Sequence, residues 1–293
     1  MNALYDLPAP AKLNLFLHIT GRRHDGYHLL QSVFMLIDWS DVLHVELRRD
    51  GQLSREDLTT PLPADDLVLR AARALQAFAA PGQGAHIGVA KHVPAQAGMG
   101  GGSSDAATCL LALNRLWGLG LPLERLERIG LALGADVPFF LRGRNAWVEG
   151  IGEAITPVAL PSGRFAVLKP PVGLDTRLIF AAEDLQRETS PAILSGFAAN
   201  DAADVLGEDI FRFGHNDLQP VAQRLCPEVR QAIEWLGSQG LEARMTGSGS
   251  AVFAPLEQRD NVPHGLLLDD PPPGWQLRQC SNLAVHPLAG WAV

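Results

Sequence analysis

The sequence predicts an α+β protein built from two domains. Some segments alternate apolar and polar residues, as β-strands do, and others repeat apolar residues every three or four positions, as α-helices do. A chain of 293 residues is long enough for two domains with separate cores. The pattern changes near residues 159–163, which places the predicted boundary between domains of residues 1–160 and 161–293.

Composition narrows the classes of function. Apolar residues make up 47% of the chain and charged residues 19%, which is typical of a globular protein. The formal net charge of −8 argues against a nucleic-acid partner, because such binding needs clustered Lys and Arg. Cys109, Cys226 and Cys280 lack metal-ligand spacing and predict a reducing compartment. With no targeting signal and no membrane span in the sequence, we expect a cytoplasmic protein.

The first predicted strand covers residues 12–20. Leu13 and Leu15 lie on its apolar face, so Lys12 and Asn14 share the opposite face. This pattern alone makes Lys12 a solvated charge at a strand end. The elements expected next are a turn at 21–28, strands at 29–39 and 41–47, an exposed loop at 51–63, a helix at 65–79 capped by its aspartates, and a strand at 85–93.

A glycine-rich loop at residues 94–105 joins that strand to a predicted helix at 106–117. This order is typical of an anion site, because glycines let backbone N–H groups approach a ligand and the first turn of a helix leaves N–H groups unpaired. Neither the P-loop nor the full dinucleotide motif is present. Alone, the loop is as consistent with a flexible connection that ends in a serine N-cap.

Asp136 follows a predicted helix at residues 122–133. An aspartate two positions before a proline commonly starts a helix, which is one interpretation of Asp136. The neighbouring Phe139 and Phe140 are apolar, however, and a carboxylate held among them needs a cationic partner. A strand at 142–148 and a turn at 149–153 complete the predicted first domain.

The predicted second domain alternates short strands and helices. They are a strand at 165–169, a short helix within 174–182, loop and short helix at 188–210, two helices within 216–240 divided at Cys226-Pro227, a strand, loop and strand at 242–254, and a strand at 276–285, with no long helix expected in 256–273. Gly247 and Gly249 are open to two interpretations: hairpin residues, or part of the wall of a nucleotide site.

Five motifs occur in order along nearly the whole chain: Pro8-Ala-Pro-Ala-Lys12-Leu-Asn14-Leu, Asp25-Gly-Tyr27-His28, Gly100-Gly-Gly-Ser-Ser104, Leu133-Gly-Ala-Asp136-Val-Pro138 and Thr246-Gly-Ser-Gly249. Together they resemble the GHMP kinase superfamily, and within it the kinases of 4-diphosphocytidyl-2-C-methyl-D-erythritol. The resemblance implies an ATP-binding domain like domain 2 of ribosomal protein S5 at residues 1–160. It implies a ferredoxin-like α/β-plait domain that binds the acceptor substrate at residues 161–293.

The activity that the resemblance implies is transfer of the γ-phosphate of ATP, supplied with Mg²⁺, to the 2-hydroxyl of 4-diphosphocytidyl-2-C-methyl-D-erythritol, a step of the non-mevalonate (MEP) isoprenoid pathway. Small-molecule substrates are then the only partners expected. Asp136 would accept or orient the hydroxyl proton, and Lys12 would keep that carboxylate ionised and stabilise the transferring group. Whether Asp136 acts as a base or as a positioning group stays open.

The resemblance also assigns binding residues. The ATP phosphates would be held by Pro94, Ala95, Gln96, Ala97, Gly98, Met99, Gly100, Gly101, Gly102, Ser103 and Ser104. The acceptor would be bound by Asn14, Tyr27, His28, Thr176 and Phe180, with Tyr27 and Phe180 stacking on the cytosine ring and His28 hydrogen-bonding it. Further nucleotide-site candidates are Asp66, Asp105, Gly247, Ser248 and Gly249. No clear protein ligand for a metal is present, and Ser104 is only a candidate.

This sequence departs from the family pattern at a few positions. Gln96 and Ala97 replace glycines of the family loop, Asp66 and Asp105 stand where asparagine is common, and residues 256–273 lack the expected helix. Three alternatives stay open. A homoserine, mevalonate or sugar kinase would share the loop and Asp136 without needing the base-binding residues. A ribosomal-protein-like RNA-binding module is disfavoured by the negative charge. Phe180 taken alone is also consistent with an ordinary core residue.

Overall fold

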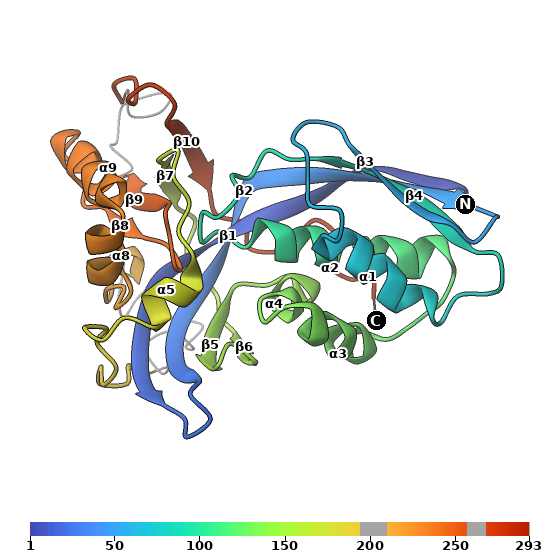
Figure 1. Ribbon diagram of the computed structural model, residues 1–293, viewed down its shortest axis with the longest axis horizontal. Helices are drawn as coiled ribbons and strands as arrows, with labels where there is room; N and C mark the ends of the chain where they lie inside the picture. The colour runs from blue at the N-terminus through green and yellow to red at the C-terminus, as the bar shows by residue number, and fades with distance from the viewer. Residues whose placement is uncertain (194–209, 257–267, 293) are drawn as a thin grey trace.

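The computed structural model describes residues 1–193, 210–256 and 268–292, which form two lobes, each built on its own β-sheet (Figure 1). The larger sheet has six strands in the order β3-β4-β2-β5-β6, with β1 paired to β2. The smaller sheet has four strands in the order β10-β7-β9-β8. Both lobes combine helices with a largely antiparallel sheet, so the predicted α+β class is confirmed, and the boundary at residue 160 stays a prediction.

The first lobe contains the strands β1 (Ala3–Arg22), β2 (His28–Arg48), β3 (Leu53–Asp57), β4 (Gly84–Ala90), β5 (Ala146–Gly150) and β6 (Ala154–Pro157), and the helices α1 (Leu67–Gln76), α2 (Gly101–Leu116), α3 (Leu123–Leu133) and α4 (Val137–Arg142). The four helices lie together beside the sheet (Figure 1). The core of this lobe joins apolar residues of the helices and the strands, including the fully buried Cys109 of α2. This cysteine packs as a small apolar residue.

The second lobe contains β7 (Arg164–Lys169), α5 (Thr176–Phe180), α8 (Gln219–Leu225), α9 (Pro227–Ser238), β8 (Arg244–Met245), β9 (Val252–Leu256) and β10 (Gln276–Ser281). The predicted division of α8 from α9 at Cys226-Pro227 is confirmed. Most of the predicted loop and short helix at 188–210, and residues 257–267 of the segment at 256–273, lie outside the described residues. In the part of the chain described, no helix is both long and apolar enough to cross a membrane.

The long strands β1 and β2 differ from the predicted short ones. Two separate strands were predicted at 29–39 and 41–47, but β2 is continuous, because Asp41 stays in the sheet as a buried partner of Lys91. Bulges interrupt the register of β1 against β2, so strict alternation does not hold in β1. Lys12 and Asn14 are buried, with 4% and 1% exposure, and the interpretation of Lys12 as a solvated strand-end charge is wrong.

Three further predictions about secondary structure need correction. The predicted exposed loop at 51–63 contains β3, which adds to the sheet edge parallel to β4. The predicted strand at 142–148 begins four residues later, as β5 at Ala146, and the predicted turn at 149–153 is shorter, at residues 151–153 between β5 and β6. Arg142 stays helical because its guanidinium pairs with Glu127 at 2.8 Å, and Gly143 with φ 64° ends the helix one residue later.

Candidate active site

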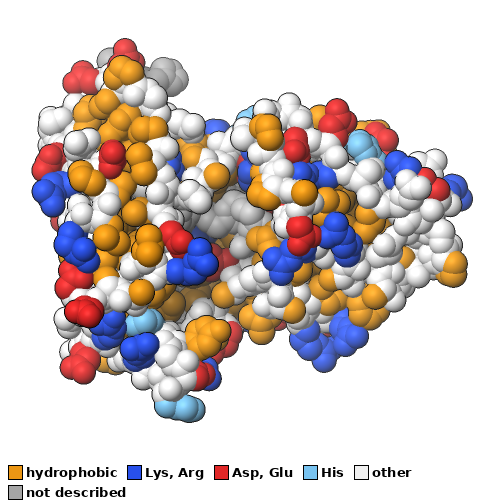
Figure 2. Space-filling model, viewed as in Figure 1, with side chains coloured by type: hydrophobic (Ala, Val, Ile, Leu, Met, Phe, Trp, Pro, Cys, Tyr) orange, Lys and Arg blue, Asp and Glu red, His pale blue; other side chains and the backbone are white. Residues whose placement is uncertain are grey.

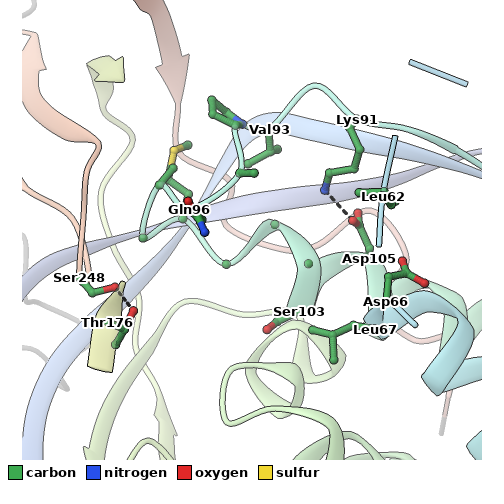
Figure 3. Close-up of a pocket in the computed structure, with 18 of the residues that line it drawn as sticks. Leu62, Asp66, Leu67, Lys91, Val93, Gln96, Ser103, Asp105, Thr176 and Ser248 are labelled. Carbon is green, nitrogen blue, oxygen red and sulfur yellow. Dashed lines mark hydrogen bonds and ion pairs between the residues drawn. The ribbon is translucent and has the colours of Figure 1, made fainter. Parts of the chain in front are cut away.

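A cleft of about 690 Å³ opens between the two lobes (Figure 2). Its floor is the glycine-rich loop, which contributes residues 93–103. One wall comes from the start of α1, and the other from residues 174–177 and from Ser248 and Gly249 of the second lobe. Figure 3 shows the loop running between these walls into α2. The cleft therefore collects most of the predicted ATP-binding residues from segments far apart in the sequence.

The glycine-rich loop and the loop between β8 and β9 touch through their backbones. Gly98 has φ +72°, and a Cβ atom placed on it would lie 2.2 Å from the Thr246 carbonyl oxygen, so only glycine fits there. Two hydrogen bonds join the loops: the N–H groups of Ser250 and Ala251 donate to the carbonyls of Gln96 and Ala97 at 3.2 and 3.3 Å. The family glycines replaced by Gln96 and Ala97 are therefore not needed for this contact. Gly247 and Gly249 both lie in the hairpin between β8 and β9, and Gly249 also lines the cleft, whereas Gly247 is not among its lining residues.

The N-terminus of α2 faces the cleft. The helix begins at Gly101, five residues before its predicted start, and its N-cap is Gly100 with φ 71° and no side-chain cap. The predicted serine N-cap is wrong, because Ser103 and Ser104 are already helical and the Ser104 hydroxyl donates to the Pro10 carbonyl at 2.7 Å. The first-turn N–H groups lack partners within the helix. Backbone donors and the positive end of the helix dipole thus suit a polyphosphate at this point.

Lys12 and Asp136 meet beside this loop. The Lys12 Nζ atom lies 3.9 Å from Asp136 Oδ2, and the Lys12 N–H donates to the Met99 carbonyl at 3.0 Å. Lys12 also donates a hydrogen bond to Asn14 Oδ1 and lies over the Phe34 ring at 4.6 Å from its centroid. Asp136 stands at the N-cap position of α4, but its side chain makes no capping hydrogen bond. The carboxylate, 31% exposed, therefore keeps its oxygens available to a ligand.

Asn14 holds the Lys12 ammonium in place. Its side-chain N–H donates to Ser32 Oγ at 2.8 Å, which directs its oxygen to Lys12. Its backbone N–H donates to Thr246 Oγ1 at 2.9 Å, which links this strand to the second lobe. Burial lowers the pKa of Lys12, and the charge of Asp136 opposes that change. An ammonium in such a buried, low-dielectric environment interacts strongly with any anion that reaches it.

A second lysine, Lys91, lies at the other end of the loop and was missed by the sequence analysis. Its ammonium forms ion pairs with Asp41 and, at 2.6 Å, with Asp105 (Figure 3). Burial and the Asp41 charge, opposed by Lys91, raise the pKa of Asp105 to about 8. Asp41 also accepts from the backbone N–H groups of His92 and Val93, at 2.5 and 2.7 Å. Lys91 could have been suspected from its place at the end of the strand that leads into the loop.

The two aspartates proposed as nucleotide contacts both line the cleft but differ in their bonds. Asp66 caps α1 by accepting from Leu69 N–H at 3.0 Å, and it pairs with Arg55 at 2.6 Å. Asp105 is 2% exposed, and its Oδ1 atom has no hydrogen-bond partner among the described residues. The carboxylate of Asp66 is thus engaged within the protein, whereas Asp105 retains a free acceptor at the cleft wall.

The residues predicted to bind the acceptor fall into separate groups. The rings of His28 and Phe180 pack together, with centroids 5.1 Å apart and planes inclined by 32°. Tyr27 is 60% exposed next to them in the sequence, so the predicted sandwich of Tyr27 and Phe180 stays a prediction. Thr176 lies at the rim of the cleft instead, where its hydroxyl shares a hydrogen bond of 2.7 Å with Ser248. Phe180 is partly buried and packs against the apolar core of the second lobe, so its interpretation as a base-stacking residue stays a prediction beside that of a core residue.

Comparison with known proteins agrees with this geometry. The chain matches the GHMP kinases N terminal domain over residues 66–144 and the GHMP kinases C terminal domain over residues 194–264. It is 76% identical to the 4-diphosphocytidyl-2-C-methyl-D-erythritol kinase of Variovorax paradoxus (strain S110), with 100% of both chains covered. It is 64% identical to the enzyme of the same name from Paracidovorax citrulli (strain AAC00-1), with 100% and 99% covered.

Solved structures give the same result. A crystal structure of a 4-(cytidine 5'-diphospho)-2C-methyl-D-erythritol kinase superposes with a TM-score of 0.71 at 35% identity, over 85% of this chain and 89% of that one. A homoserine kinase from Cytophaga hutchinsonii, with a TM-score of 0.66 at 15% identity over 98% and 96% of the chains, shares the fold alone. The two-domain fold, the loop site and these relatives together show that the chain belongs to the 4-diphosphocytidyl-2-C-methyl-D-erythritol kinases of the GHMP kinase family.

Proposed function

We propose that this kinase transfers the γ-phosphate of ATP to the 2-hydroxyl of 4-diphosphocytidyl-2-C-methyl-D-erythritol, as a cytoplasmic enzyme of the non-mevalonate isoprenoid pathway. The observation that carries the proposal is the approach of the Lys12 ammonium to the Asp136 carboxylate beside the glycine-rich loop, at 3.9 Å. The identity of 76% over the full length of both chains supports the choice of acceptor. The catalytic roles of Lys12 and Asp136 and the binding role of the glycine-rich loop belong to the same proposal.

In the proposed reaction, backbone N–H groups of the loop and of the first turn of α2 hold the ATP phosphates. Asp136 accepts a hydrogen bond from the acceptor hydroxyl and aligns its oxygen with the γ-phosphorus. A bond forms between that oxygen and phosphorus, the bond from the γ-phosphorus to the β-γ bridging oxygen breaks, and ADP leaves. The hydroxyl proton passes to Asp136 and then to water. The Lys12 ammonium stabilises the charge on the transferring group.

The proposed reaction uses Mg²⁺, and the side chains at the site determine whether the protein itself can bind this ion. Among the residues that the structure describes, no group of three or more His, Cys, Asp or Glu side chains could hold a metal ion. The Ser104 hydroxyl is fully buried and donates to Pro10, so it does not face the cleft. These residues do not form a metal site of the protein. We therefore expect Mg²⁺ to arrive bound to ATP, as part of that substrate.

The acceptor base is expected to bind at His28 and Phe180. Replacing Phe180 with Ala removes the aromatic face, and stacking of a base is worth roughly 1–3 kcal/mol. We expect KM for the acceptor to rise about tenfold or more while KM for ATP stays unchanged, as measured by steady-state release of ADP. Leu178→Ala is the matched control, because Leu178 lies on the same helix α5 and is 62% exposed.

The test of the whole proposal uses wild-type protein with ATP and different acceptors. Phosphorylation of 4-diphosphocytidyl-2-C-methyl-D-erythritol, with no turnover of homoserine or mevalonate, is the expected result. Binding of CMP in isothermal titration would support the base site independently. Turnover of homoserine or mevalonate without CMP binding would instead identify a different acceptor.

A further inference from the structure

Arg187 lies in the segment after α5, where each of its three guanidinium nitrogens donates at least one hydrogen bond. Its terminal nitrogens donate to three backbone carbonyls: to Ala182 at 2.5 Å, and to Glu183 and Leu185 at 3.2 and 3.0 Å. The remaining donor, Nε–H, points to His28 Nε2 at 3.2 Å. The three carbonyl contacts fix the plane of the guanidinium, so the direction of its Nε–H toward His28 is fixed as well.

The contact with Arg187 determines which nitrogen of His28 carries the proton. A guanidinium has only donors and stays protonated, so His28 Nε2 must be the acceptor in this hydrogen bond. In a neutral imidazole that accepts at Nε2, the hydrogen is on Nδ1. The charged groups that act on His28 are Arg187 and Arg22, and no described carboxylate forms an ion pair with it. Burial, followed by Arg187 and Arg22, lowers the pKa of His28, so the ring is neutral at physiological pH.

We propose that Arg187 is a positioning residue for base selection, which fixes His28 as the Nδ1–H tautomer and so presents a hydrogen-bond donor beside Phe180. A donor at this position matches the unprotonated ring nitrogen N3 of cytosine. It disfavours uracil, whose N3 carries a hydrogen. The identification of the base as cytosine rests on the proposed function, whereas the tautomer follows from the contacts within the chain.

The tautomer can be measured without any ligand. We suggest ¹⁵N NMR of the imidazole nitrogens of full-length protein labelled at histidine, with the signals of His28 assigned from the spectrum of His28→Gln. Wild-type His28 is expected to show a protonated Nδ1 and an unprotonated Nε2 at neutral pH. In Arg187→Met, the ring loses its fixed donor, and we expect the proton to redistribute to Nε2 and the pKa of His28 to rise.

Binding measurements then connect the tautomer to selection of the base. Arg187→Met is expected to weaken CMP binding by about tenfold in isothermal titration and to reduce the preference for CMP over UMP, while the affinity for ATP stays unchanged. Arg187→Lys, which keeps a charged donor, should recover part of the preference. Arg224→Met is the matched control, because Arg224 pairs with Asp184 in the same segment without contacting His28.

Two results would overturn the proposal. One is a wild-type His28 that carries its proton on Nε2. The other is an unchanged preference for CMP over UMP in a folded Arg187→Met protein whose tautomer has changed. If Arg187→Met does not fold, the wild-type spectrum still tests the tautomer of His28, and the Arg187→Lys titration still tests the preference for CMP over UMP. Failure of wild type to bind CMP would count against the proposed function, but it would leave the assignment of the tautomer intact.

Discussion

Two contacts between lysine and aspartate flank the same glycine-rich loop, and they are built in opposite ways. Lys91 is enclosed by two carboxylates, Asp41 and Asp105, whose side chains are 0% and 3% exposed. Lys12 has one carboxylate neighbour, Asp136, at 3.9 Å and 31% exposed. The first group is buried and tightly paired through the Lys91 ammonium. The second is loosely paired, and its carboxylate is partly exposed to solvent.

This difference indicates separate tasks for the two lysines. An ammonium held between two buried carboxylates has little attraction left for a ligand, so Lys91 stabilises the strand end from which the loop begins. An ammonium beside one partly exposed carboxylate can still attract an incoming phosphoryl group. Position next to a nucleotide loop is therefore not enough to identify a catalytic lysine. The number and the burial of its partners distinguish the two.

The largest effect is expected from Lys91→Met. It leaves the buried Asp41 carboxylate without its cation, and breaking a buried pair in this way costs about 3–5 kcal/mol of unfolding free energy. Lys12→Met is the control, and it should cost less, about 1–2 kcal/mol, because Asp136 remains partly solvated while the buried Asn14 oxygen loses its donor. Urea denaturation at neutral pH measures both variants. Equal losses would contradict the contrast between the two pairs.

Asp136→Asn tests the catalytic side of the comparison. Loss of the carboxylate removes the group proposed to orient the acceptor hydroxyl, and we expect kcat to fall about a hundredfold to a thousandfold. The same change at Asp105 should lower kcat less than about tenfold, because Asp105 acts on Lys91 rather than on the reacting atoms. Steady-state kinetics, with circular dichroism as a check on folding, compare the two. A similar loss in both variants would remove the distinction.

Asp105→Asn should also change how stability depends on pH. The pKa of Asp105 is raised from 3.8 to about 8, so the folded protein holds a proton that the unfolded chain releases. The contribution of this carboxyl to stability is present below pH 3.8 and is lost as pH rises through about 8. Asparagine does not titrate in this range. The free energy of unfolding of Asp105→Asn, relative to that of wild type, should therefore increase with pH, by at most about 1.4 kcal/mol per pH unit. Urea titrations at several pH values measure it, and a constant difference would contradict it.

The smallest effect concerns Lys12 in the wild-type enzyme. Burial lowers its pKa below the usual 10.5, and the charge of Asp136 only partly offsets this. Lys12 should therefore lose its proton at a lower pH than an ordinary lysine, and kcat should decline on the alkaline side below 10.5. The pKa of Lys91 is raised instead, because its two carboxylates outweigh burial, so Lys91 does not contribute to this decline. A kcat that stays constant to pH 10.5 would contradict the assignment to Lys12.

Much of the fold followed from local patterns in the sequence. The limits of α3 were predicted from Pro122 and Gly134, and the division of α8 from α9 from Pro227, because these residues act through backbone geometry. The continuity of β2 depended on Asp41, which looks like a strand breaker until its distant partner Lys91 is known. The edge strand β3 likewise exists through its pairing with β4.

Site residues that belong to the five ordered motifs were predicted from the sequence. Residues that reach the site only through contacts between distant segments were missed. Lys12 and Asp136 were named from their motifs, but the burial of Lys12 depends on its packing against Phe34 and Asn14, which the motifs do not reveal. Nothing in the sequence near Arg187 links it to His28, since the two lie 159 positions apart. Such a pairing depends on how the segment after α5 folds back over the first hairpin.

Strand β1 extends from the first lobe into the core of the second, and this affects the order in which the protein can fold. Its residues Leu17 and Ile19 are buried in the core of the second lobe, against apolar side chains of α8, α9 and β9. This half of β1 is therefore synthesised early in translation, whereas α8, α9 and β9, which cover it, are synthesised late. Until α8, α9 and β9 have been synthesised, Leu17 and Ile19 lack part of the apolar cover that they have in the folded protein, and this end of the hairpin is a surface that a chaperone could bind.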